Sequence, residues 1–105
     1  MVSDFQTLGY FVVTRYNSLP DVMAFKLARG ELIAVAGEFQ EVCVNGDCLD
    51  SICRDFQKGF NQVLIVTPNQ RVKEDILRHI RQHIPEQLRY NIAVVVMRQQ
   101  GSKLN

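Results

Sequence analysis

Two short apolar runs, Val63–Val66 and Ile92–Met97, place the strongest constraint on the fold of this chain. Neither run alternates with polar residues, so each is typical of a strand that is covered on both faces. Between them, the segment 70–84 carries valine or isoleucine at every fourth position, which indicates an amphipathic helix. A strand, a helix and a second strand in this order predict parallel strands joined by a right-handed crossover.

Three further strands are expected before this unit. Tyr10–Tyr16 is dense in β-branched and aromatic residues, and Asp21–Leu27 and Glu31–Phe39 follow it. The tripeptide Ala28–Gly30 suits a hairpin turn between the last two. We therefore expect a three-strand meander followed by a β-α-β unit.

Helical segments are expected in three places. Phe5–Leu8 reads as the last turn of a helix that ends at Gly9. A second helix runs from Asp47, its expected N-cap, to about Phe60. A third begins after Asn69 and runs from Gln70 to Ile84, where Pro85 ends it. The buried stripe of the second helix is expected to contain Leu49, Ile52, Cys53, Phe56 and Phe60.

The predicted fold is thus α/β, in the order (α)βββαβαβ, with a mixed β-sheet of about five strands flanked by helices. A chain of 105 residues predicts a single domain over 1–105, either independent or the terminal part of a longer protein, with a flexible tail over 99–105. The sequence contains 47% hydrophobic and 22% charged residues, which is typical of a globular protein.

No apolar run approaches the roughly 20 residues that cross a bilayer, and the first residues do not form a secretory signal. We therefore expect a cytoplasmic protein without a membrane partner. Cys43, Cys48 and Cys53 form no C-x-x-C pair and are interpreted as reduced thiols near one helix. A redox or metal-binding role for them is the alternative.

The hairpin carries a recognisable pattern of acids. Pro20-Asp21 precedes one strand, and Ile33-Ala34-Val35-Ala36-Gly37-Glu38 lies in the next. This pattern resembles the metal-binding hairpin of the restriction-endonuclease-like, PD-(D/E)XK, nuclease superfamily, in which a proline-aspartate pair precedes a strand with an acid, any residue and a lysine. The predicted order of elements is similar to the core of that superfamily over nearly the whole chain.

The resemblance implies a Mg²⁺ site that activates water beside a phosphodiester. In the first of two registers, Ala36 replaces the metal-binding acid and Glu38 replaces the lysine, so the site is degenerate. In the second, the motif is shifted to Glu38-Phe39-Gln40, and Asp21 and Glu38 are the metal ligands. The candidate catalytic residues are then Asp21, Glu38, Gln40 and Lys58, the last as a displaced cation.

Charge is divided unevenly along the chain. Up to Cys53 there are three basic and seven acidic residues, and from Arg54 onward there are nine basic and four acidic residues. An acidic region beside a basic one is typical of a metal site next to a phosphate-binding surface, and is also common on surfaces without a ligand. The candidate DNA-binding residues are Arg54, Lys58, Arg71, Lys73, Arg78 and Arg81, with Arg89 and Arg98 as further cations.

His79 and His83 are four residues apart, which is a metal-ligand spacing, but no third ligand is evident from the sequence, and packed or semi-exposed histidines are favoured. The functional hypothesis is a non-catalytic DNA-binding or assembly domain of a DNA-processing protein, acting in restriction, repair, recombination or conjugation, with DNA as partner and no cofactor. One alternative is a Mg²⁺-dependent DNA endonuclease. Another is a protein-interaction domain that forms a homodimer or docks on domains of a parent protein.

Overall fold

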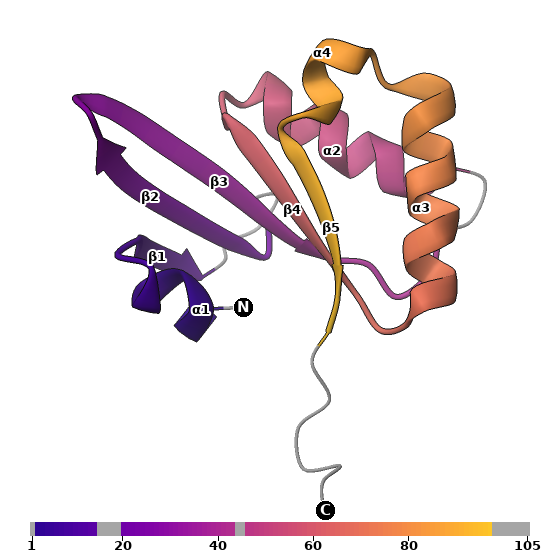
Figure 1. Cartoon of the computed structure of the whole chain (residues 1–105), viewed down its shortest axis with the longest axis horizontal. Coiled ribbons are helices and arrows are strands. Elements are labelled where there is room, and N and C mark those ends of the chain that lie inside the picture. The colour runs from indigo at the N-terminus through magenta and orange to yellow at the C-terminus, as the bar shows by residue number, and fades with distance from the viewer. Residues whose placement is uncertain (1, 15–19, 44–45, 98–105) are drawn as a thin grey trace, which may run out of the picture.

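The computed structural model describes residues 2–14, 20–43 and 46–97, and within them it contains one five-stranded sheet in the order β1-β2-β3-β4-β5 (Figure 1). The first three strands pair antiparallel, and the third, fourth and fifth pair in parallel. This confirms the predicted α/β fold with a mixed sheet. The strands are β1 Phe11–Thr14, β2 Val22–Ala28, β3 Glu31–Phe39, β4 Gln62–Thr67 and β5 Ile92–Val96.

Helices cover the two faces of the sheet unequally. Helix α2 (Asp47–Gln57) connects β3 to β4, and α3 (Gln70–His83) connects β4 to β5. Both connections step in the same direction along the sheet, so right-handed crossovers place both helices on one face (Figure 1). The short α1 (Val2–Thr7) packs on the opposite face, and a further short helix, α4 (Glu86–Arg89), was not predicted.

Two apolar clusters follow from this layering. The larger lies between the sheet and α2 and α3, and the smaller lies between the sheet and α1. Successive residues of a strand point to opposite faces, so β3 contributes Ala36 to the larger cluster and Val35 to the smaller one. The buried members of the larger cluster are Ala36, Cys48, Ile52, Val63, Ile65, Ile76, Ile80, Ile84 and Val94.

The β2–β3 turn consists of two residues, Arg29 and Gly30. Ala28 pairs with Glu31, and the two residues between them have φ angles of 54° and 79°. Positive φ at both central positions is the signature of a type I′ hairpin turn, whose twist matches that of the flanking strands. The turn thereby fixes the register that places residue 22 opposite residue 37.

The prediction that both apolar strands are covered on two faces is correct for β4 and wrong for β5. Val94 is buried on the α3 side, but Val95 and Met97 are exposed. The reason is that β5 is an edge strand and that α1 packs against β1 instead. Part of the predicted strand Tyr10–Tyr16, the turn that follows it and the tail 99–105 lie outside the described residues.

Helix α2 differs from its prediction in three respects. Its N-cap is Gly46, and Asp47 is the first helical residue. It ends at Gln57, because Gly59 adopts a φ of 100° and turns the chain toward β4. Its buried side contains Cys48, Ile52 and Asp55, whereas Cys53 is exposed.

In the described part of the chain, no helix has both the length and the apolar character needed to cross a membrane.

Replacing Asn69 by alanine should destabilise the protein. The Asn69 side chain accepts a hydrogen bond of 3.0 Å from the Val72 amide, as predicted for the N-cap of α3. Loss of such a cap lowers the free energy of unfolding by about 1 kcal/mol. Urea denaturation measures this, with Gln82→Ala on the exposed part of α3 as the control. Equal midpoints for the two variants would show that the cap contributes nothing.

Candidate functional site

Asp21 and Glu38 lie at facing positions of neighbouring strands. Val22 pairs with Gly37, so the next step of the antiparallel register places Asp21 opposite Glu38 on the face covered by α2. The Asp21 Oδ2 atom accepts a hydrogen bond of 2.9 Å from the Phe39 amide. Two acids that are 17 positions apart in the sequence therefore meet at one point of the sheet.

A third carboxyl group, that of Asp55, comes from α2. Asp55 is fully buried, and Glu38 is 5% exposed. Among the described residues, both oxygens of Asp55 and the Oε2 atom of Glu38 have no hydrogen-bond partner unless the two carboxyl groups share a proton. Buried carboxyl oxygens without partners are unfavourable unless they share a proton or bind a cation. This cluster of Asp21, Glu38 and Asp55 is named the acidic site below.

The pKa of Glu38 is raised from 4.5 to about 9. Burial is the largest cause, because it disfavours the charged form. The Asp55 carboxyl follows, through hydrogen bonding to the protonated form and through repulsion of the charged form, and Asp21 adds weaker repulsion. Arg54 acts in the opposite direction. At neutral pH, Glu38 therefore carries a proton that it can share with Asp55.

The other residues of the predicted motif have different surroundings. Ala36 is completely buried in the larger core cluster, where its methyl group offers no ligand atom. The backbone N–H of Gln40 donates a hydrogen bond of 2.9 Å to the Val66 carbonyl and extends the pairing of β3 with β4. Lys58 is an exposed residue at the C-cap of α2. Arg54 is thus the cation that acts on Glu38.

Three of the predicted DNA-binding cations of α3, Arg71, Arg78 and Arg81, are exposed, whereas Lys73 is half-buried. Arg71 and Lys73 lie in its first turn, which contains no acidic residue, and Arg78 and Arg81 follow about two and three turns after Arg71. Arg78 forms an ion pair of 3.1 Å with Asp75. A positive row therefore begins at the helix N-terminus, where free backbone N–H groups favour anions.

Arg89 has a structural role. Its guanidinium group donates to the Ile84 and Arg81 carbonyls over 2.8 Å each, at the end of α3. These contacts satisfy carbonyl groups that the last turn of a helix leaves unpaired. The Arg89 guanidinium is thus engaged within the fold, and Arg98 lies outside the described residues.

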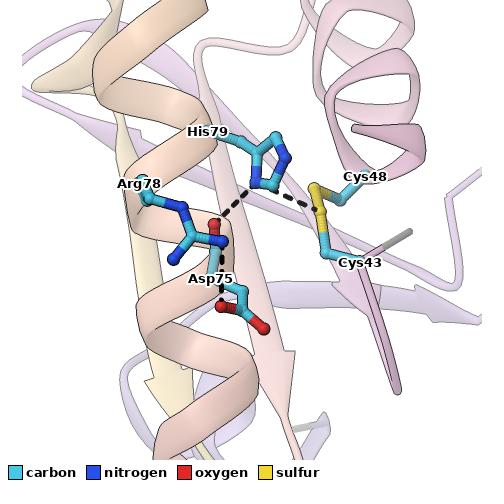
Figure 2. Close-up of a disulfide and its surroundings, with 5 residues drawn as sticks. All are labelled: Cys43, Cys48, Asp75, Arg78 and His79. Carbon is cyan, nitrogen blue, oxygen red and sulfur yellow. Dashed lines mark hydrogen bonds and ion pairs between the residues drawn. A yellow bond between two sulfur atoms is a disulfide. The ribbon is translucent and has the colours of Figure 1, made fainter. Parts of the chain in front are cut away.

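A second cluster joins the start of α2 to α3 (Figure 2). Cys43 and Cys48 form a disulfide, so the prediction of reduced thiols is wrong for this pair, whereas Cys53 is free and exposed. His79 extends from α3 toward the disulfide, and its Nδ1 atom lies 3.9 Å from the Cys43 sulfur and 2.8 Å from the Asp75 carbonyl oxygen.

Sequence reasoning missed Asp55, although a signal was present. Cys48, Ile52 and Asp55 are spaced by four and three residues, so they lie on one side of a helix. Because Cys53 was assigned to the buried stripe of this helix, the predicted buried side was rotated away from Asp55. In the described residues, no group of three or more His, Cys, Asp or Glu side chains is arranged to hold a metal ion.

Comparison with known proteins gives no relative for this chain: no family model matches it, and neither the curated proteins nor the solved structures contain a match.

The stability of the protein should fall as the pH rises from about 5 to 9. The folded state keeps the Glu38 proton that the unfolded state releases above its ordinary pKa of 4.5, so the stabilisation is complete below that pH and lost as the pH approaches 9. The limiting slope is about 1.4 kcal/mol per pH unit. Glu38→Gln should remove most of this slope in urea denaturation across the pH range.

Glu41→Gln is the matched control, because it removes an exposed glutamate three residues away and should retain the wild-type slope. If Glu38→Gln retained that slope as well, Glu38 would be ionised in the folded protein at neutral pH.

Proposed function

We propose that this chain is a DNA-binding domain with a restriction-endonuclease-like fold that holds duplex DNA by its phosphates without cutting it. It belongs, in this proposal, to a cytoplasmic DNA-processing protein. The supporting fold observation is the order of elements, in which an antiparallel hairpin and a β-α-β unit bring an acidic cluster to one face of the sheet.

The observation that carries DNA binding is the row of cations along the exposed side of α3. Phosphate contacts need cations and backbone N–H groups at positions open to solvent, and the first turn of α3 offers both. Asp75 offsets the charge of Arg78, which leaves Arg71 and Arg81 as the exposed arginines of α3 that no ion pair in the described structure engages.

The acidic site supports the absence of cleavage. Phosphodiester hydrolysis of this type needs ionised oxygen ligands and a cation beside the attacking water. Here Ala36 occupies the position that the metal-binding acid has in the motif. Glu38 is protonated at neutral pH because it is buried against Asp55. A divalent cation would first have to displace that proton, which lowers its apparent affinity at neutral pH.

One observation favours the alternative of a Mg²⁺-dependent nuclease. The carboxyl groups of Asp21, Glu38 and Asp55 supply the hard oxygen ligands that Mg²⁺ prefers, and three of their buried oxygens have no partner in the described structure. In the described residues these three carboxyl groups are not arranged to hold a metal ion, so they would have to move closer together to bind it, with Arg54 as the nearby cation. The ion would supply charge neutralisation at the phosphate.

DNA binding should be salt-dependent and should require α3. Arg71→Ala and Arg81→Ala should each weaken binding to duplex DNA, and each should reduce the slope of log K against log salt by roughly one. Fluorescence anisotropy at several salt concentrations measures both quantities. Arg29→Asn, an exposed arginine of the β2–β3 turn at positive φ that asparagine tolerates, is the matched control. Unchanged slopes in both α3 variants would exclude α3 as the phosphate-binding surface.

The same duplex, incubated with the protein and Mg²⁺ or Mn²⁺, should remain intact at neutral pH. Branched and single-stranded DNA are tested in parallel on gels. Cleavage that rises with pH and disappears in Asp21→Asn and Asp55→Asn would support the nuclease instead, because raising the pH removes the Glu38 proton. Cleavage that survives in both variants would indicate a contaminating nuclease.

A further inference from the structure

Three potential zinc ligands from two places in the sequence, Cys43, Cys48 and His79, meet at one place in the fold, and His83 adjoins His79. Cys43 and Cys48 are brought together at the start of α2, and His79 reaches them from α3. His83 lies one turn further along α3, and its ring stacks on His79 with 6.4 Å between the ring centroids. The spacing, C-x4-C followed by H-x3-H, agrees with that of structural zinc sites.

The tautomer of His79 suits a metal ligand, although the ring nitrogen that lies 3.9 Å from the Cys43 sulfur is Nδ1. A carbonyl oxygen only accepts hydrogen bonds, so the contact of 2.8 Å to Asp75 requires the proton on Nδ1. The lone pair is then on Nε2. Histidine ligands of zinc commonly donate a hydrogen bond from one ring nitrogen to a backbone carbonyl and bind the metal through the other ring nitrogen.

The spacing of the two histidine rings is close to that of two imidazoles bound to one ion. From Zn–N bonds of about 2 Å and a tetrahedral angle, two imidazoles on one zinc have ring centroids roughly 5 Å apart. The observed 6.4 Å exceeds this by little more than 1 Å. His83 is an exposed residue at the end of α3, so a side-chain rotation can supply the difference.

We propose that Cys43, Cys48, His79 and His83 bind one Zn²⁺ ion when the disulfide is reduced. In the oxidised state shown in Figure 2, both sulfur atoms are bonded to each other and neither is available as a thiolate ligand. The protein thus has two alternative links at this place. One is the disulfide between Cys43, which precedes α2, and Cys48 in the first turn of α2. The other is a zinc ion that also joins α2 to α3.

The exchange of the disulfide for a zinc ion begins with a reduction. A cellular dithiol transfers two electrons and two protons to the disulfide, which becomes two cysteine thiols, while the dithiol becomes a disulfide. Zn²⁺ then displaces the two thiol protons and accepts electron pairs from two thiolates and two neutral imidazoles. In the reverse step a cellular disulfide accepts two electrons from the two thiolates and two protons from water and becomes a dithiol, while the Cys43–Cys48 bond forms again and the ion is released.

The experiment uses the full chain and Co²⁺ as a spectroscopic substitute for zinc. A phosphine reduces the disulfide, taking up the oxygen of one water molecule, and does not itself leave a competing thiol. Co²⁺ added without oxygen should then give the intense visible bands of a tetrahedral site and a thiolate-to-metal charge-transfer band. Zn²⁺ should abolish both at one equivalent per chain, and the oxidised protein should give neither.

Variants identify the ligands. Cys43→Ser, Cys48→Ser and His79→Ala should each lower the affinity at least 10- to 100-fold, since even residues behind the ligands have effects of this size. Cys53→Ser is the matched control and should bind as the wild type, because Cys53 is exposed and outside the disulfide. His83→Ala alters an exposed residue, so weaker binding in this variant reports ligation and not misfolding. Circular dichroism checks the fold of each variant.

Three outcomes would overturn the proposal. The reduced wild type could give no tetrahedral Co²⁺ spectrum. Binding could persist unchanged in both histidine variants. Finally, an octahedral spectrum that is lost in Asp55→Asn and retained in Cys43→Ser would place the ion at the acidic site. None of these results bears on the salt-dependent DNA binding by α3, so the two proposals fail separately.

Discussion

The burial of Asp55 against Glu38 is the constraint on which the rest of this site depends. The side of α2 that carries Cys48 and Ile52 packs on the sheet. The same side carries the Asp55 carboxyl group, which is shielded from solvent. A buried charge without a partner is strongly unfavourable, so the pair keeps a proton and the pKa of Glu38 rises to about 9. The protonation of the acidic site is therefore a consequence of how α2 is docked.

Much of the fold follows from local pattern. The hairpin turn, the Asn69 cap and the four-residue repeat of α3 are determined by residues close in sequence, so periodicity and turn chemistry were sufficient to predict them. The exposed side of β5 was predicted wrongly, because a run of valines indicates the strand but not whether it lies at an edge. The edge position depends on the order of all five strands.

The candidate site was predicted less completely for a related reason. The meeting of Asp21 and Glu38 follows from strand register, which the turn at Arg29 and Gly30 determines within the hairpin. The contribution of Asp55 depends on the rotation of α2 about its axis, and one misassigned cysteine changed that rotation in the prediction. The contact of Cys43 with His79 joins segments 36 residues apart, and neither segment alone contains a complete ligand set.

Helix α2 connects the two clusters. Cys48 and Asp55 are seven residues apart, which is about 10 Å along a helix, and both lie on the side that faces the sheet. Linking the start of α2 to His79 on α3 would restrict the position of this helix on the sheet, and that position determines how closely Asp55 approaches Glu38. Burying two carboxyl groups lowers stability relative to an apolar pair of the same size. A rigid attachment at the start of α2 would help to hold them in place, so the sulfur chemistry and the protonation of the acidic site act on the same helix.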